Sequence, residues 1–230
     1  PVTLGDGTIG DDFQPGNTLT SRMWLKTKEL ILADEAFKLD AQGAADETFK
    51  YDFSSNPRDL VKGGRMEILI WNTDAISAAI KESKAGNSVL LVNFANNRIP
   101  GGDYRGKYNA QEEDICRKTS LAFALDKSLG LQTKTDLYPI NRSVQDTKAL
   151  LSPGIKVYWQ QVASGTFRQL SPPIAINVIT VPAFDSRSVW KASNESPEDA
   201  QCFQEPFAEI KGKRYYSFSP HGLELTRARI

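Results

Sequence analysis

Blocks of hydrophobic and polar positions alternate along the chain and predict strands and helices in turn. The apolar run at residues 89–94 predicts a buried strand, and residues 111–128 repeat apolar positions at helical spacing. Because strands alternate with helices, the predicted fold class is α/β with a mixed, mainly parallel sheet. Further strands are expected at residues 67–71, 137–140, 156–162, 174–181 and 214–218, and further helices at residues 20–38, after a cap at Thr73 or Asp74, and at residues 223–230.

Each predicted helix has an apolar side. In one of these helices, two acidic residues lie away from the apolar side. Glu112 and Glu113 fall off the apolar stripe of the helix at residues 111–128 when it is wound at 3.6 residues per turn. They are therefore free to face a cleft. The apolar positions are Trp24, Leu25, Ile31, Leu32 and Ala36 in the first helix, Ile76, Ala79 and Ile80 in the second, and Ile115, Ala122, Leu125 and Leu129 in the third.

The chain reads as one domain. Its 230 residues contain no internal repeat, low-complexity tract or linker. Residues 1–20 are rich in Gly, Asp and Thr and predict an irregular arm, and residues 185–209 predict a long polar excursion. The last helix reaches Ile230 without a cap or turn, so we expect a single domain over residues 1–230 that is truncated at its C-terminus.

Charge and composition exclude several classes of partner. The chain has 28 basic and 28 acidic residues, so its net charge offers no general attraction to nucleic acid or to a membrane surface. No apolar run reaches the length of a membrane span, and no secretory signal is visible. We expect a cytoplasmic protein that binds neither nucleic acid nor membrane, and the sequence leaves its oligomeric state open.

Cysteine and histidine are scarce. Two cysteines, Cys116 and Cys202, make no disulfide framework, and His221 is the single histidine. Histidine-based triads and zinc sites are therefore disfavoured, and we expect neither a metal nor another cofactor. A dyad of Cys116 and His221 stays open, but a structural thiol is the simpler interpretation of Cys116.

The richest candidate chemistry follows the strand at residues 89–94. A polar loop containing glycine leads from this strand to Gln111, Glu112 and Glu113, where the next helix begins. Such a loop commonly holds a ligand in an α/β protein, and adjacent carboxylates suit cleavage of a glycosidic bond. The alternative is a helix start enriched in acids because the helix dipole favours them.

This segment resembles the microbial-type poly(ADP-ribose) glycohydrolases. The family pattern Gly-Gly-Gly…Gln-Glu-Glu stands here as Gly101-Gly102-Asp103, seven residues, and Gln111-Glu112-Glu113. The likeness covers residues 24–184 and continues more faintly to Ile230. Further family-like stretches are residues 93–96, 114–121, 138–140, 152–157 and 178–183.

The resemblance implies a macro-domain-like, three-layer α/β/α fold and hydrolysis of ADP-ribose O-glycosidic linkages. Glu113 would be the catalytic acid and base, with Glu112 beside it on a ribose. ADP-ribose, poly(ADP-ribose) or an ADP-ribosylated protein would be the partner. The substrate-binding residues implied are Asn96, Gly101, Gly102, Asp103, Gln111 and Phe184.

Each loop residue also has a plainer interpretation. Asn96 is alternatively a turn asparagine that bonds its own backbone, and Gly101 and Gly102 an ordinary turn after Pro100. Arg98 and Arg105 could contact phosphate, but solvated loop arginines are the simpler interpretation. Phe184 could line the cleft, but core packing is its simpler role.

The chain departs from the family pattern in two ways. Asp103 replaces the third glycine, and no second glycine-rich phosphate loop precedes Ile230. The carboxylate of Asp103 could alter the approach of the backbone to a diphosphate or bind a substrate hydroxyl or an arginine. Two other functions therefore stay open: hydrolysis of mono-ADP-ribose from protein side chains, and ADP-ribose binding without turnover.

Overall fold

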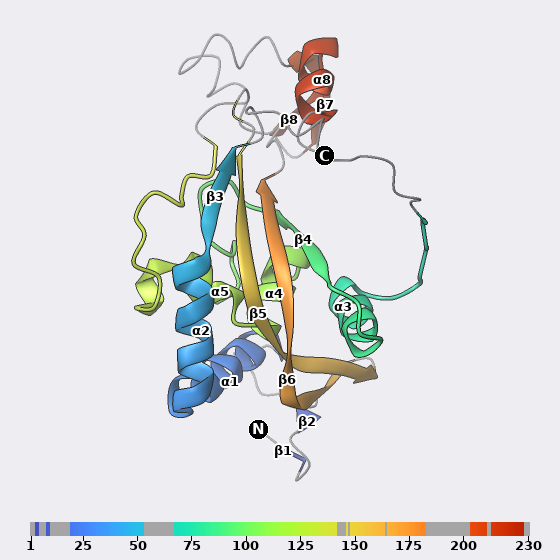
Figure 1. Ribbon diagram of the computed structural model, residues 1–230. Coiled ribbons are helices and arrows are strands. Elements are labelled where there is room, and N and C mark those ends of the chain that lie inside the picture. The colour runs from blue at the N-terminus through green and yellow to red at the C-terminus, as the bar shows by residue number, and fades with distance from the viewer. Residues whose placement is uncertain are drawn as a thin grey trace.

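The computed structural model describes most of the chain between residues 19 and 182 and a shorter part after it. The described residues are 3–4, 8–9, 19–52, 67–141, 146, 148–163, 165–182, 203–210 and 213–227. Figure 1 shows strands β3, β5, β6 and β4 side by side, with helix α2 below β3, helix α1 next to the lower end of α2, and helix α3 on the side of β4.

A long hairpin forms the centre of the sheet. Strand β5 (Lys148–Ala163) pairs antiparallel with β6 (Thr166–Pro182), and Gly165 turns the chain between them at a φ of 68°. Strand β4 (Leu90–Ala95) runs parallel to β6, and β3 (Phe49–Asp52) antiparallel to β5. The short strand β2 (Thr8–Ile9) pairs with the first residues of β6, and β1 (Thr3–Leu4) pairs with β2.

The mixed α/β sheet is confirmed, but the expected majority of parallel pairs is wrong for the described strands. Only β4 and β6 run parallel there. Parallel neighbours need a crossover, whereas β5 and β6 follow each other through a tight turn and must be antiparallel. The apolar pattern located these strands but carried no information on the turn between them.

Two predicted strands are not formed. Residues 67–71 and 137–140 have no regular structure. Ile68, Leu69 and Ile70 are all exposed, while Leu137 and Ile140 are buried in an irregular segment. In a separate sheet, β7 (Phe203–Ile210) pairs with β8 (Lys213–Phe218), and helix α8 (Pro220–Arg227) follows. Strand β8 and helix α8 match the strand and helix expected near the C-terminus.

The first predicted helix is two helices. Asp34 separates α1 (Leu19–Ala33) from α2 (Glu35–Glu47), because its carboxylate accepts the N–H groups of Ala36 and Phe37 at 2.9 and 3.2 Å and caps α2. Trp24 and Ile31 are buried as expected, but Leu25, Leu32 and Ala36 are exposed. Because the helix breaks at Asp34, the buried side of α2 does not continue the apolar stripe that a single helix would have.

The third predicted helix also breaks, at a contact with β5. Helix α4 (Gln111–Lys118) ends before Ser120, whose N–H donates to Lys156 O at 2.9 Å. Lys156 N–H donates back to Ser120 Oγ at 3.0 Å, so this pair replaces helical hydrogen bonds. Helix α5 (Leu121–Leu125) and the 3-10 turn η2 (Lys127–Leu129) continue the chain.

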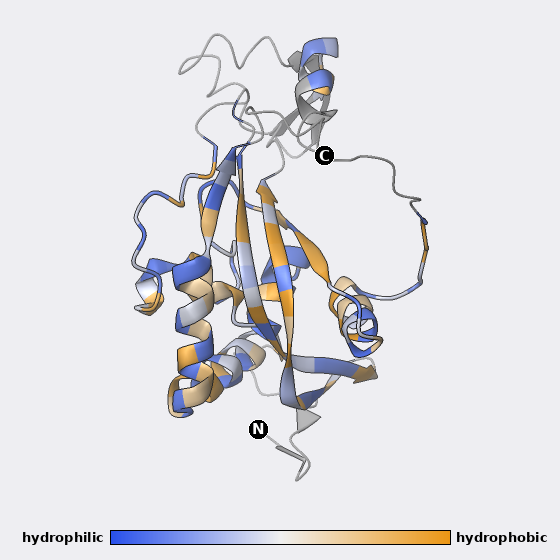
Figure 2. Cartoon of the chain, viewed as in Figure 1, coloured by the Kyte–Doolittle hydropathy of each residue, from blue (hydrophilic) through white to orange (hydrophobic). Residues whose placement is uncertain are grey.

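Helix α3 (Ala75–Lys84) confirms its prediction closely. Asp74 accepts the N–H of Ser77 at 2.9 Å and caps the helix, and Ile76, Ala79 and Ile80 are buried. In Figure 2, many residues of the strands β4, β5 and β6 are coloured as hydrophobic.

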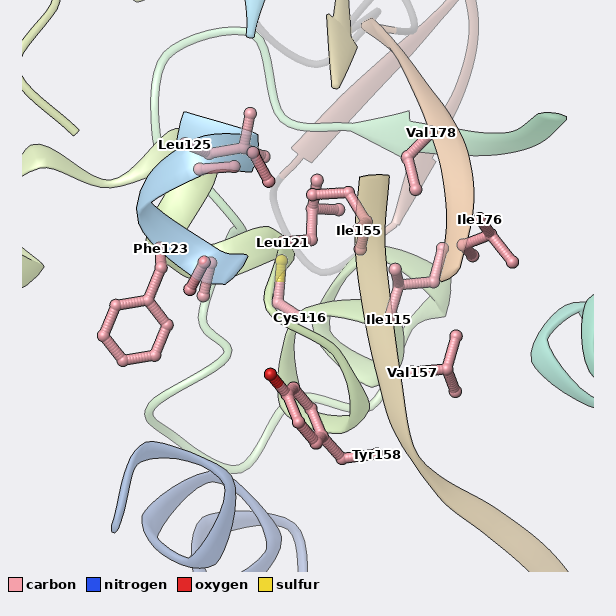
Figure 3. Close-up of a cluster of buried hydrophobic side chains, with 14 of the residues drawn as sticks. Ile115, Cys116, Leu121, Phe123, Leu125, Ile155, Val157, Tyr158, Ile176 and Val178 are labelled. Atoms are coloured by element: carbon pink, nitrogen blue, oxygen red, sulfur yellow. The ribbon is translucent and has the colours of Figure 1, made fainter. Parts of the chain in front are cut away.

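The core joins the sheet to α4 and α5. Figure 3 shows Ile115, Cys116 and Leu121 from these helices beside Ile155 of β5 and Val178 of β6, and all five are fully buried. Full burial of a Leu or Ile side chain contributes roughly 1.5–3 kcal/mol. The helix that carries the paired glutamates is therefore held firmly by its apolar face.

Candidate active site

A tight turn presents the two glycines to the start of α4. Gly102 N–H donates to Ile99 O at 3.1 Å, with Pro100 and Gly101 between them and Gly101 at a φ of 71°, which defines a type II turn. Asn96 Oδ1 accepts the N–H groups of Arg98 and Ile99 at 2.8 and 2.9 Å. The loop after β4 therefore has its own local hydrogen bonds.

The carboxylate of Glu113 joins both ends of the next loop. Its Oε1 accepts Asp103 N–H at 3.0 Å, and its Oε2 accepts Ala110 N–H at 3.2 Å. Glu113 is the third residue of α4, so the second contact also caps the helix. The side chain is 8% exposed. These contacts fix its orientation beside the Gly101–Gly102 turn.

Glycine is required where the turn meets the carboxylates. A Cβ atom on Gly102 would lie 2.3 Å from Glu113 Oε1 and 3.1 Å from Glu112 Oε2, and Gly102 has a φ of 60°. A Cβ atom on Gly101 would lie 2.7 Å from the ring of Tyr104 and 3.0 Å from Cys116 Sγ. Both predicted glycines therefore allow a close approach of backbone to side chain.

Glu112 is more deeply buried than its neighbour, at 4% exposure. Its Oε2 accepts Asn96 N–H at 2.7 Å, whereas its buried Oε1 has no hydrogen-bond partner in the described part of the chain. Burial, and after it the charge of Glu113, raises the pKa of Glu112 from 4.5 to about 8, while the N–H groups of Asn96 and Gly101 act against this. Its environment therefore favours the protonated form of Glu112.

Tyr138 places a second buried polar atom near Glu112. Its hydroxyl has no hydrogen-bond partner among the described residues. Burial, and next the charge of Glu112, raises the pKa of Tyr138 well above its usual value. In the sequence, Tyr138 was noted only as part of a family-like stretch, because no local pattern predicts the direction of a tyrosine side chain in a loop.

Two predicted ligand-binding side chains form hydrogen bonds within the protein. Gln111 Oε1 accepts Phe94 N–H, and its Nε2 donates to Val92 O, both at 3.0 Å. This side chain fastens α4 to β4. Asn96 Oδ1 is taken by the turn, as its plainer interpretation had it, while its backbone N–H orients Glu112. Phe184 lies outside the described residues.

The carboxylate of Asp103 lies against residues 106 and 108 of its own loop. It is exposed, its Oδ2 accepts Tyr108 N–H at 3.4 Å, and a Cβ atom on Gly106 would lie 2.3 Å from that oxygen. Asp103→Gly should therefore leave the ratio of turnover on polymer to turnover on ADP-ribosylated protein unchanged, as exposed substitutions change free energies by only about 0.5 kcal/mol. Rates on both substrates measure this ratio. A changed linkage preference would show that the carboxylate contacts substrate.

Sequence reasoning missed the residues that hold this loop. Arg117 is buried and donates to Tyr104 O at 2.8 Å. Tyr104 donates its hydroxyl to Asp126 at 2.8 Å, and Arg105 binds the same carboxylate at 2.7 Å. Their spacing gave no signal, because each contact joins segments that only the tertiary structure brings together.

The cysteine alternative loses support. Cys116 is fully buried beneath Gly101, and burial, then the charges of Glu112 and Glu113, raises the pKa of its thiol well above the usual value. His221 is exposed in α8. Within the described ranges, no cluster of three acidic, histidine or cysteine side chains is arranged for a metal ion, and no helix is long and apolar enough to cross a bilayer.

The sequence belongs to a known family. The profile described as "Microbial-type PARG, catalytic domain" matches residues 25–162, more than half of the chain. The chain is thus a member of the microbial-type poly(ADP-ribose) glycohydrolase (PARG) family, and the resemblance seen in the sequence is confirmed. No curated protein matches the chain.

Solved structures confirm the macro-domain-like α/β fold. Poly(ADP-ribose) glycohydrolase from Thermomonospora curvata is 19% identical with a TM-score of 0.58, over 78% of this chain and 69% of that one. The same enzyme with the inhibitor ADP-HPD is 22% identical with a TM-score of 0.56, over 74% and 64%. The Deinococcus radiodurans enzyme with ADP-ribose is 20% identical with a TM-score of 0.52, over 69% and 62%. The chain therefore spans about two thirds of these relatives.

Proposed function

We propose that this chain hydrolyses ADP-ribose O-glycosidic linkages, with poly(ADP-ribose) as substrate and Glu113 as general acid and base. Family membership supports the reaction class, and related structures hold ADP-ribose and the inhibitor ADP-HPD. The single observation in this chain that carries the proposal is the buried, unpartnered Oε1 of Glu112. A buried polar atom without a partner costs roughly 1–3 kcal/mol, and a ligand hydroxyl bound to Oε1 would remove that cost.

The carboxyl pair supplies the proton that glycosidic cleavage needs. Burial favours the protonated form of Glu112, and this proton passes to the neighbouring Glu113 when Glu113 acts as the acid. Glu113 donates it to the leaving oxygen as the bond from that oxygen to ribose C1 breaks. Water then attacks the oxocarbenium-like C1, and its proton returns through Glu113 to Glu112, so the protein ends unchanged.

The remaining groups orient the ribose. Glu112 Oε1 and the Tyr138 hydroxyl are the buried polar atoms available to its hydroxyl groups. The backbone of Gly102 lies against both carboxylates, so close that a side chain at this position would collide with Glu113. Asn96 acts on the site through its N–H to Glu112, and Gln111 through its bonds to β4.

The protonation state of Glu112 has a measurable effect on stability. An unfolded glutamate ionises near 4.5, whereas Glu112 in the folded chain does so at about 8, so folding takes up a proton between these pH values. Stability contributed by this group therefore falls as pH rises from about 4.5 to about 8 and is constant above. Glu112→Gln should be more stable than wild type at pH 8 by on the order of a few kcal/mol, and little changed at pH 4.5.

Thermal unfolding across this pH range tests that prediction. Glu29→Gln, an exposed change on α1, is the control and should leave the pH profile unchanged. Parallel profiles for wild type and Glu112→Gln would show that Glu112 is ionised in the folded protein at neutral pH.

Labelled substrates test the proposed function. The chain is incubated with radiolabelled poly(ADP-ribose) and, separately, with protein carrying mono-ADP-ribose, and the products are separated by chromatography. We expect free ADP-ribose from the polymer. Release from the modified protein alone would identify a mono-ADP-ribosyl hydrolase. ADP-ribose binding in calorimetry without product from either substrate would identify a binding module and overturn the proposal.

A further inference from the structure

A buried guanidinium supports the loop between the glycine turn and the paired glutamates. Arg117 lies in α4 and is 1% exposed. It donates to Tyr104 O at 2.8 Å, to Asp103 O and Gly106 O at 3.2 Å each, and to Tyr108 O. Its remaining terminal nitrogen lies 3.4 Å from Asn109 Oδ1. These acceptors all belong to residues 103–109, which we call the support loop.

Arg117 and Glu113 hold the support loop from the same side of α4. They are four positions apart, so their side chains lie on one face, one helical turn from each other. Glu113 accepts hydrogen bonds from the N–H groups of Asp103 and Ala110, while Arg117 donates hydrogen bonds to carbonyl groups of the support loop. The acidic and basic side chains thus satisfy opposite polar groups of the same segment.

The contact with Glu113 depends on the path of this loop. Asp103 N–H reaches Glu113 Oε1 because residues 103–109 follow a compact course, and the described structure places the Arg117 guanidinium inside that course. We propose that Arg117 is a positioning residue, which holds the support loop so that the loop's N–H groups fix the carboxylate of Glu113. This role rests on the proposed function of Glu113, although the support of the loop does not.

Binding and turnover should respond differently. The Gly101–Gly102 turn is closed by Gly102 N–H donating to Ile99 O, and Ile99 N–H donates to Asn96 Oδ1; Arg117 takes part in neither hydrogen bond. Arg117→Lys keeps the charge but has fewer donors and no planar fork. We expect kcat to fall roughly 10- to 100-fold, as misplaced catalytic groups do, with KM and the Kd for ADP-ribose within about threefold of wild type. Amide hydrogen exchange at residues 104–109 should become faster while exchange in α3 is unchanged.

Lys118→Met is the matched control. Lys118 is the neighbouring buried cation on α4 and pairs with Asp114 instead of the support loop. The Lys118→Met variant should leave amide hydrogen exchange at residues 104–109 unchanged. Arg117→Ala with millimolar guanidinium should regain part of the lost kcat, whereas ammonium should not restore it. If Arg117→Lys does not fold, Asn109→Ala removes one loop acceptor and should show a smaller change of the same kind.

Three outcomes are informative. Unchanged loop exchange and unchanged kcat in a folded Arg117→Lys would overturn the role of Arg117. A loss of kcat that Lys118→Met reproduces would reduce that role to general stability and also overturn it. A wild-type chain without turnover would instead remove the proposed function, and faster loop exchange in Arg117→Lys would still show that Arg117 holds the support loop.

Discussion

Glu113→Gln should abolish nearly all hydrolysis while preserving ADP-ribose binding. The amide matches the carboxylate in size but cannot deliver a proton, and loss of a general acid typically costs a factor of about 100 to 10,000 in rate. The amide can accept only one of the two N–H groups now bound to Glu113, those of Asp103 and Ala110. A loss of stability of about 1–3 kcal/mol should therefore accompany the loss of rate. Initial rates on labelled polymer and calorimetry with ADP-ribose measure activity and binding, and a thermal melt measures stability.

Glu112→Gln is the natural comparison. It removes an ionisable group from the same helix turn, but its proposed contact is with a ribose hydroxyl, so it should weaken affinity as well as rate. Circular dichroism and a thermal melt establish that both variants are folded. Wild-type turnover by folded Glu113→Gln would refute the catalytic assignment and leave Glu113 as a helix-capping residue.

Gly102→Ala should have the second largest effect. The new Cβ atom would lie 2.3 Å from Glu113 Oε1, so the carboxylate or the turn must move. The φ of 60° adds a strain of roughly 1 kcal/mol for any residue with a side chain. Because a displacement of about 1 Å at a reacting group lowers rates on the order of 100-fold, we expect a loss of that size in kcat.

Gly86→Ala separates the steric effect from backbone strain. Gly86 has a φ of 86°, follows α3, and has nothing within 4 Å of an added Cβ atom. It should lose similar stability to backbone strain and retain full turnover, as measured by melting temperature and initial rate. Equal kcat in the two variants would show that the space beside Glu113 is not used in the reaction.

Local sequence signals predicted the elements whose causes are local. The cap at Asp74 and the buried positions of α3 follow from a side chain acting on its own helix turn. The same kind of signal was present at Asp34, but the apolar pattern on both sides of it suggested one continuous helix. Asp34 caps α2 nonetheless, so a capping residue outweighed periodicity at this position.

Features that depend on distant residues could not be predicted. Ser120 ends α4 because Lys156 of β5 lies beside it, 36 positions along the chain. The direction of β5 relative to β6 depends on a turn at Gly165, which the strand pattern does not encode.

The candidate site shows the same division between local and distant causes. The family pattern predicted Gly102, Glu112 and Glu113 in one place, and the structure brings them together, since a Cβ atom added to Gly102 would lie 2.3 Å from Glu113 Oε1 and 3.1 Å from Glu112 Oε2. The pattern did not distinguish residues that face a ligand from residues that support the site. Gln111 is a support for β4, and Arg117 looked like an ordinary helix cation, although it is buried under the loop.

The role of Glu113 as proton donor is best examined in a crystal structure of Glu113→Gln with a short ADP-ribose oligomer. We predict a ribose against residues 112–113 and beside the Gly101–Gly102 turn, with a hydroxyl on Glu112 Oε1. We also predict the glycosidic oxygen within about 3.5 Å of the amide that replaces the Glu113 carboxylate, the distance that proton transfer from the native residue requires. An oligomer bound elsewhere, with Glu112 Oε1 still unpartnered, would contradict this role.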